Sequence, residues 1–373
     1  MRIAFFADSY KPYLSGVTNA IDVLAKELRH LGHKVYIFAP FYPHYTETDP
    51  DVIRFPSFAG GYPKFRLAIP YVKNFPDVDL IHSHTPFQSG LLARYLARQR
   101  QLPFVYSFHT LFTRYVHYAR FVPKELAKMG IVAYLRSFCH GADQIITPSD
   151  MAKRVLRAWQ VKTPITVVPS GVELHNYPKD PLAMREVLRL KLSIPLAAKV
   201  LLYVGRISEE KNIPFLLKVL ERITEPNLRL VLVGGGPLAK GLIKHHDRRL
   251  ILTGEIPYPE ILHYYSLGDL FLFSSLTETQ GLVLAEAKAA GLPIVAQFAG
   301  GLTGTIRSGI DGYLVKRDLK TYVHHVKRLL ADDQLSREMS SAALADVRER
   351  FAASVVAKQI ESVYNSLNKS REA

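Results

Sequence analysis

Two glutamates eight residues apart have the spacing and surroundings to bind the hydroxyl groups of a sugar or ribose. Glu278 and Glu286 stand in Leu276-Thr-Glu-Thr-Gln-Gly-Leu-Val-Leu-Ala-Glu-Ala287, directly after an apolar run. A helix predicted from about Gly281 would place Glu286 among apolar side chains, where a carboxylate needs polar partners such as hydroxyl groups. The free amides of Gly281 and Leu282 would favour a phosphate. The alternative is a first-turn glutamate that complements the helix dipole, beside one exposed glutamate.

Two cations lie in a second glycine-containing loop that also follows an apolar run. Arg206 and Lys211 are five residues apart in Val204-Gly-Arg-Ile-Ser-Glu-Glu-Lys-Asn212. An arginine fork and a lysine point charge beside a helix start together neutralise a diphosphate. Because Glu209 and Glu210 lie between them, a solvated charged loop is the alternative.

A third loop, Pro12-Tyr-Leu-Ser-Gly-Val-Thr-Asn19, follows the first apolar run and precedes a helix predicted over Asn19–Leu31. Gly16 would let backbone amides approach an anion closely. The loop has neither the G-x-G-x-x-G dinucleotide pattern nor the lysine of a P-loop. An ordinary loop with a Thr or Asn N-cap is the alternative.

The elements that must position these loops are short apolar strands that alternate with helical patterns. Such alternation is typical of parallel sheets covered on both faces. We predict two doubly wound α/β domains, residues 1–170 and 182–350, joined by a Pro- and Gly-containing linker and followed by a C-terminal helix over about 351–373. Ligands of such domains bind at the carboxyl ends of the strands, so we expect a site in the cleft between the domains. The predicted strands are Arg2–Ala7, Lys34–Ala39, Leu80–Ser83, Phe104–Phe108, Gln144–Thr147, Thr166–Val168, Val200–Val204, Leu228–Val233, Leu250–Leu252, Leu270–Phe273 and Pro293–Ala296.

The net charge of +15 indicates an anionic partner, and it is unevenly distributed. Residues 52–124 carry ten basic and two acidic side chains, a net of +8, and are rich in Phe and Tyr. No apolar run approaches the roughly 18–20 residues of a membrane-spanning helix, and an acidic residue, Asp8, follows too early for a secretory signal. The single cysteine, Cys139, excludes an intramolecular disulfide framework and fits a reducing compartment. We therefore expect a cytoplasmic protein, soluble or peripheral to a membrane.

In combination and order, these three loops resemble those of the retaining GT-B glycosyltransferases of family 4. The resemblance covers nearly the whole chain. It implies two Rossmann-like domains with a nucleotide-sugar in the cleft, an acceptor held mainly by the N-terminal domain, and a last helix that packs back on that domain. It implies no cofactor beyond the nucleotide-sugar as co-substrate.

The resemblance also implies a role for each donor-side residue. Arg206 and Lys211 would bind the diphosphate, Glu286 the ribose hydroxyls and Glu278 the sugar hydroxyls. The remaining donor-side positions are the amides of Gly281 and Leu282 on the distal phosphate, Gly16 and Val17 closing on the diphosphate, and the backbone of Gly254 and Ile256 near the base.

His109, at the end of the predicted strand Phe104–Phe108, matches the family histidine near the transferred sugar. A capping or packing histidine is its alternative role. With Arg206, Lys211 and Glu278, His109 completes the implied catalytic set, and Asp8 is a candidate on the acceptor side. We expect no metal, because the Asp77-Val-Asp79 sequence precedes a strand instead of following one.

One segment departs from the family pattern, which commonly has a Gly-Gly-x-Pro-Glu turn after the strand at Pro293–Ala296. Here Ala299–Thr305 reads Ala-Gly-Gly-Leu-Thr-Gly-Thr and lacks both the proline and the glutamate.

Within the family, the motifs resemble those of bacterial 1,2-diacylglycerol 3-glucosyltransferases, which implies UDP-glucose as donor and a membrane lipid as acceptor. Basic residues among aromatic ones fit peripheral attachment to the inner face of the cell membrane, with Arg114, Arg120 and Lys124 on the membrane side. Solvated cations over a packed aromatic core are the alternative. Other acceptors remain open: phosphatidylinositol, a soluble sugar or a polysaccharide. A basic nucleic-acid-binding protein is a distant alternative, because it would leave Glu278 and Glu286 unexplained.

Overall fold

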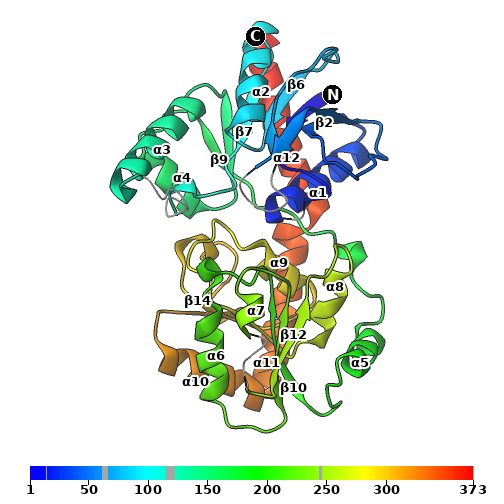
Figure 1. Ribbon diagram of the computed structural model, residues 1–373, viewed down its shortest axis with the longest axis vertical. Coiled ribbons are helices and arrows are strands. Elements are labelled where there is room, and N and C mark those ends of the chain that lie inside the picture. The colour runs from blue at the N-terminus through cyan, green and yellow to red at the C-terminus, as the bar shows by residue number, and fades with distance from the viewer. Residues whose placement is uncertain (14, 61–65, 115–121, 243–245, 373) are drawn as a thin grey trace. The chain divides into compact units, whose positions relative to one another are not determined.

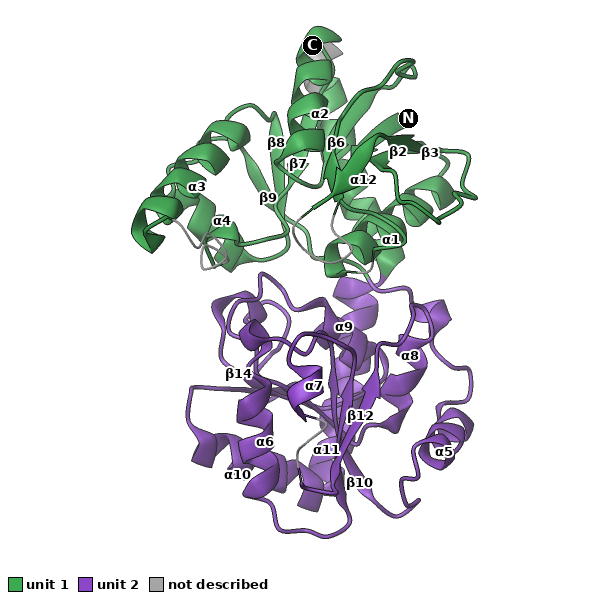
Figure 2. Ribbon diagram, viewed as in Figure 1, with its two compact units in different colours: residues 1–171, 353–373 green, residues 172–352 purple. Residues whose placement is uncertain are grey.

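The computed structural model describes residues 1–13, 15–60, 66–114, 122–242 and 246–372. Its contacts divide the chain into two compact units, shown in Figure 2. Unit 1 comprises Met1–Gly171 and Ala353–Ala373, and unit 2 comprises Val172–Ala352. The C-terminal helix therefore belongs to the same unit as the N-terminal strands.

Unit 1 is built on a parallel sheet with the strand order β3-β2-β1-β6-β7-β8-β9 (Figure 1). Between β3 and β6 in the sequence, the short strands β4 and β5 pair antiparallel with each other. The strands are β1 Arg2–Phe6, β2 Lys34–Pro40, β3 Val52–Phe55, β4 Ser57–Ala59, β5 Arg66–Ala68, β6 Leu80–Ser83, β7 Phe104–Ser107, β8 Gln144–Thr147 and β9 Ile165–Val167. The helices are α1 Gly16–His30, α2 Gln88–Gln99, α3 Lys124–Cys139, α4 Asp150–Ala158 and α12 Ala353–Glu372, with a 3-10 turn η1 at Phe112–Arg114.

The alternation of side chains along β1 explains why both faces of this sheet are covered. Ile3 and Phe5 pack in one core with α1 and α12, whereas Ala4 and Phe6 pack in another with α2, α3 and α4. Successive strand residues point to opposite faces, so a continuous apolar strand requires helices on both.

Unit 2 repeats this architecture with the strand order β12-β11-β10-β13-β14-β15. The strands are β10 Lys199–Val204, β11 Leu228–Val233, β12 Leu250–Gly254, β13 Leu270–Phe273, β14 Ile294–Gln297 and β15 Gly312–Val315. The helices are α5 Pro181–Lys191, α6 Ile213–Glu221, α7 Ala239–Leu242, α8 Ile261–Tyr264, α9 Leu282–Ala289, α10 Leu319–Ala331 and α11 Asp333–Asp346. Short 3-10 or π turns lie at η3 Leu174–Asn176, η4 Glu209–Lys211, η5 Tyr265–Leu267, η6 Gly300–Leu302 and η7 Val347–Phe351.

In each sheet the strand order reverses between two neighbouring parallel strands. These strands are β1 and β6 in unit 1, and β10 and β13 in unit 2. At such a point the loops from the two carboxyl ends diverge and leave a place for a ligand. The reversal points therefore locate the loops to inspect for a site.

The doubly wound α/β prediction is confirmed, with local differences in the edge strands and at the start of α1. The edge strands β3 and β15 and the β4–β5 hairpin escaped prediction because they are short and only partly buried. Helix α1 begins three residues before the predicted Asn19, because the Ser15 hydroxyl accepts a hydrogen bond from the Thr18 amide (3.2 Å) and caps it. The C-terminal helix packs Val356, Ile360 and Tyr364 into the core beside β1.

A fully buried lysine ties three segments of unit 2 together. The Lys288 ammonium on α9 forms ion pairs with Asp311 (3.0 Å) and Asp346 and donates to the Thr305 carbonyl (2.9 Å). Removing one partner from a buried ion pair leaves an uncompensated charge out of water.

We expect Lys288→Met to lower the free energy of unfolding of unit 2 by up to about 3 kcal/mol, because Asp311 and Asp346 lose their shared buried cation and keep only the partly exposed Arg307 and Arg350. Hydrogen exchange of the α9 and α11 amides across a urea series measures this change. The matched control is Lys199→Met, whose exposed pair with Asp333 (3.3 Å) is worth about 0–1 kcal/mol. Equal losses in the two variants would contradict the expectation.

Candidate functional site

The loops after β10 and β13 meet at the reversal point of unit 2. Lys211 on the first loop forms an ion pair with Glu278 on the second, and both side chains are mostly buried. The Ser274 hydroxyl at the end of β13 donates to the Lys211 carbonyl (2.7 Å) and fastens one loop to the other. Arg206 is half-buried on the first loop, and its carbonyl accepts from the Tyr203 hydroxyl (2.9 Å). The structure thus brings together the predicted lysine and glutamate.

Two glycines are required by the backbone around Glu278. Gly281 has φ +74° and begins α9 at Leu282, as predicted; a Cβ there would lie 2.9 Å from Leu302. A Cβ on Gly301 would lie 2.1 Å from the Glu278 carbonyl oxygen. The segment Ala299–Thr305, although it departs from the family pattern, therefore still supports the Glu278 loop by close backbone contact.

Glu286 is buried on α9, as the sequence indicated, and its polar partner is a tyrosine. The Tyr265 hydroxyl donates to Glu286 Oε2 (2.6 Å), and the Tyr177 hydroxyl donates to the Glu286 main-chain carbonyl (2.9 Å). Burial raises the pKa of the Glu286 carboxyl, and the hydrogen bond from Tyr265 lowers it.

Gly254 is the last residue of β12, the edge strand of the unit 2 sheet, and Ile256 follows it. Gly254 has φ +76°, and its carbonyl accepts from the Gly234 amide (3.0 Å). Ile256 packs partly buried against the core of unit 2. Their backbone thus lies at the carboxyl end of the sheet, two strands from β10.

In unit 1, two histidines at the ends of neighbouring strands are joined. His109 follows β7, and its Nε2 lies 3.1 Å from Nδ1 of His84, which follows β6. The two rings are nearly parallel, and His84 also packs edge-on against Phe5. Burial lowers the pKa of His109 to about 4 and that of His84 well below its usual value. Both rings are therefore neutral at physiological pH.

The sequence analysis did not select His84, nor His82 beside it on β6. His82 Nδ1 lies 2.6 Å from the Tyr364 hydroxyl on α12, and its Nε2 lies 2.8 Å from the Ser107 hydroxyl on β7. The His-Ser-His sequence at the end of a predicted strand was the signal that could have found them.

A small cavity of about 30 Å³ lies beside these histidines within unit 1. Its lining includes His84, His109 and apolar side chains of α1 and α12, such as Val23 and Val356. This volume is enough for a water molecule.

The candidates that follow β1 are Asp8 in the loop and Gly16 and Val17 at the start of α1. Asp8 is buried, and its Oδ1 accepts from the amide and the hydroxyl of Ser89 (2.8 Å each) at the start of α2. Gly16 and the half-buried Val17 form the first turn of α1, and a Cβ on Gly16 would meet no atom within 4 Å. The fold itself therefore does not require glycine at position 16.

The expected membrane side is only partly as predicted. Lys124 begins α3 and is exposed, as is Arg114 in η1, whereas Arg120 lies outside the described residues. Not all aromatic side chains of this basic segment reach the surface: Phe138 is buried between α3 and the sheet, because its position on α3 faces β7.

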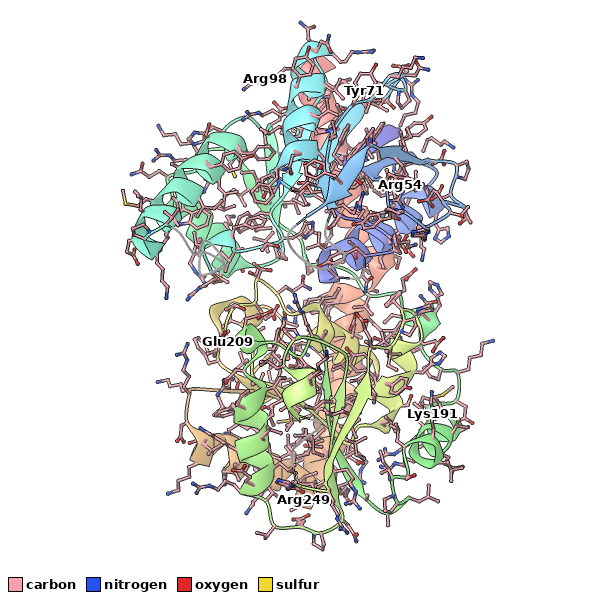
Figure 3. All side chains as sticks on the ribbon, viewed as in Figure 1. Arg54, Tyr71, Arg98, Lys191, Glu209 and Arg249 are labelled. Carbon is pink, nitrogen blue, oxygen red and sulfur yellow. The ribbon has the colours of Figure 1, made fainter. Side chains whose placement is uncertain are left out.

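Arg54 is also not available to a membrane, although Tyr71 is exposed (Figure 3). The Arg54 guanidinium pairs with Glu47 and donates to the carbonyls of Pro40 (2.9 Å) and Lys11 (2.8 Å). This arginine therefore holds loops of unit 1 together.

The Asp77-Val-Asp79 sequence precedes β6, as predicted, and its carboxylates form ion pairs with an arginine side chain. Both carboxylates pair with Arg2, at 2.9 Å for Asp79. Within the described ranges, no three His, Cys, Asp or Glu side chains are grouped so as to hold a metal ion. Over the same ranges, none of the helices combines the length and apolar character needed to cross a membrane.

We expect His109 to titrate near pH 4 instead of near 6.5, the ordinary value for histidine, because burial disfavours its charged form. Nitrogen-15 NMR of labelled histidine measures this. The unfolded chain binds more protons below pH 6.5, so this residue lowers the stability of unit 1 as the pH falls from 6.5 towards 4. A His109 resonance that titrates like N-acetylhistidine would contradict the expectation.

Two family models match the chain, one in each half. The model "Glycosyltransferase Family 4" matches residues 14–176, and "Glycosyl transferases group 1" matches residues 184–346. The alpha-monoglucosyldiacylglycerol synthase of Streptococcus pneumoniae is 34% identical over 79% of this chain and 71% of its own length. The enzyme of the same name from Acholeplasma laidlawii is 30% identical over 98% and 97%.

Solved structures show the same fold at lower identity. A sucrose-phosphate synthase from Thermosynechococcus elongatus superimposes with a TM-score of 0.80 and 23% identity, covering 99% of each chain. HepE from Anabaena, solved with UDP-glucose, superimposes with a TM-score of 0.74 and 19% identity, covering 98% of this chain and all of its own.

Proposed function

This chain belongs to the family 4 glycosyltransferases of the GT-B fold, and we propose that it transfers glucose from UDP-glucose to diacylglycerol, with retention of configuration, at a membrane surface. The observation that carries the proposal is its similarity, over up to 98% of its length, to two enzymes named for α-monoglucosyldiacylglycerol. UDP-glucose carries its glucose in an α linkage, so an α-linked product corresponds to retention.

Unit 2 has the groups that a nucleotide-sugar requires. Arg206 and Lys211 would stabilise the negative charge that develops as the diphosphate departs. Glu278 would accept hydrogen bonds from sugar hydroxyls, and Glu286 from the ribose. Because Lys211 and Glu278 already hold each other in place, the nucleotide-sugar would bind to two side chains that need no further ordering.

Unit 1 would present the acceptor and a neutral histidine. A neutral His109 would exchange a hydrogen bond with a sugar hydroxyl without adding positive charge to the reacting centre. We propose that the proton of the acceptor hydroxyl passes to the departing phosphate, as the family resemblance implies. The fold does not require glycine at position 16, and close approach of a ligand to the backbone there would explain why the residue is glycine.

We further propose that the reaction needs no metal ion, because Arg206 and Lys211 would supply the positive charge for the diphosphate. The protein would bind the inner face of the cell membrane through the start of α3. There Val122, Leu126 and Met129 are 43%, 60% and 67% exposed beside Lys124 and Lys128. Apolar side chains flanked by cations support attachment to an anionic interface.

We expect purified protein to form α-glucosyldiacylglycerol from UDP-glucose and diacylglycerol vesicles, unchanged in rate by EDTA. Lys211→Ala should lower kcat about 100-fold, because it removes charge stabilisation of the departing diphosphate. The exposed Lys327→Ala on α10 is the control and should keep the wild-type rate.

NMR of the product determines its linkage. A parallel screen of sugar donors and acceptors determines which of them the protein uses. A β-linked product would contradict retention, and loss of rate with EDTA would contradict metal independence. Transfer only to phosphatidylinositol, a soluble sugar or a polysaccharide would replace the proposed acceptor.

We expect the double variant Arg114→Glu/Lys124→Glu to bind anionic vesicles at least about tenfold more weakly, because each basic residue near the surface adds about 1 kcal/mol. Vesicle co-sedimentation at low and high salt measures this. The control is Lys320→Glu, an exposed reversal in unit 2. Equal pelleting of the two proteins would contradict attachment through unit 1.

A further inference from the structure

The Glu286 side chain on α9 lies among three tyrosines from other segments of unit 2. Burial raises the pKa values of Tyr177, Tyr258 and Tyr265; the charge of Glu286 raises them further, after that of Glu173 in the case of Tyr258. Their hydrogen bonds differ. Tyr265 donates to the carboxylate (2.6 Å), Tyr177 to the Glu286 main-chain carbonyl (2.9 Å) and Tyr258 to the Glu173 carboxylate (3.2 Å).

The hydrogen bond from Tyr265 restricts the carboxylate in a site that water barely reaches. Tyr265 is fully buried in η5, and Glu286 is 7% exposed. The bond commits Oε2 to the phenol, so a ligand hydroxyl would be accepted chiefly by the second oxygen. Hydrogen bonds to ionised groups are stronger than neutral ones and are costly to lose when buried.

The Tyr265 ring is itself held in place. It stacks against Phe271 of β13, and its hydroxyl lies 3.4 Å from the Val283 carbonyl in the first turn of α9. Because η5 is the element before β13, the Tyr265 hydroxyl is held next to the strand whose following loop carries Glu278. The geometry therefore connects the two glutamates through rigid backbone.

We propose that Tyr265 is a positioning residue for the nucleotide: its hydroxyl holds the Glu286 carboxylate in the orientation that accepts hydrogen bonds from ribose hydroxyls. This inference rests on the proposed function, in which Glu286 binds the ribose. Tyr265 acts through Glu286 and does not itself contact the substrate.

The test compares two tyrosine-to-phenylalanine variants, each of which removes one hydrogen bond that a tyrosine hydroxyl donates to Glu286. Calorimetric titration with UDP should show about tenfold weaker binding for Tyr265→Phe, because the carboxylate loses its donor. Tyr177→Phe, which loses the bond to the main-chain carbonyl instead, should stay within about threefold of the wild type. Replacing Tyr265 with 4-aminophenylalanine, which keeps a donor on the ring, should restore the affinity.

A double-mutant cycle separates positioning from general packing. In a Glu286→Gln background, Tyr265→Phe should weaken UDP binding by less than about twofold further, because its effect passes through the carboxylate. A packing role would instead give the same loss in both backgrounds.

The pH dependence of binding is a second readout. The tyrosine hydroxyls bonded to Glu286 are neutral, while the Glu173 carboxylate lies behind Tyr258 and the UDP phosphate also takes up protons. The part of the acid limb that belongs to Glu286 is therefore the part that Glu286→Gln removes. The Tyr265 hydrogen bond lowers the pKa of Glu286, so its removal should shift the loss of affinity on acidification to higher pH.

The outcomes distinguish the two proposals. If the wild type fails to bind UDP, the proposed donor is wrong. If the wild type binds UDP and Glu286→Gln weakens it, while Tyr265→Phe matches Tyr177→Phe in affinity and acid limb, the positioning role is wrong and the proposed function stands. Should Tyr265→Phe not fold, the 4-aminophenylalanine variant decides: lost affinity in that folded protein overturns the inference.

Discussion

The reversal of strand order inside each parallel sheet is the constraint on which the site depends. Neighbouring strands β1 and β6, and likewise β10 and β13, send their following chain to opposite sides. Their carboxyl-end loops therefore diverge and keep polar side chains within reach of a ligand. The loops that carry Asp8 and His84 begin at these strands in unit 1, and those that carry Arg206 and Glu278 in unit 2, so within each unit the topology selects which loops lie side by side.

The charged and polar groups at these loops are matched within each unit. Lys211 pairs with Glu278, Glu286 accepts from Tyr265, and His84 contacts His109. Buried polar groups need such partners, since leaving them unpaired costs stability. The same contacts reduce the rearrangement that a ligand would require, which is the usual advantage of a preorganised site.

The net charge of +15 has more than one physical role. Arg54 and Lys288 neutralise carboxylates inside their units, and Arg2 pairs with Asp77 and Asp79. The exposed apolar residues at the start of α3 are aliphatic, while Phe138 is buried. Composition therefore indicated an anionic partner, but helix periodicity decided which side chains reach solvent.

The sequence by itself determined the central strands, the start of α9 at Gly281 and the loops that carry Arg206, Lys211, Glu278 and Glu286. Continuous apolar runs and a glycine that permits φ +74° are local signals. The half-buried edge strands β3 and β15 give weaker signals, because Arg54 interrupts the apolar run of one and the other begins at Gly312. The pairs His84–His109 and Tyr265–Glu286 join residues 25 and 21 positions apart. Only tertiary packing decided those pairs, because a hydrogen bond between separate strands and helices depends on where the folded sheet places their ends.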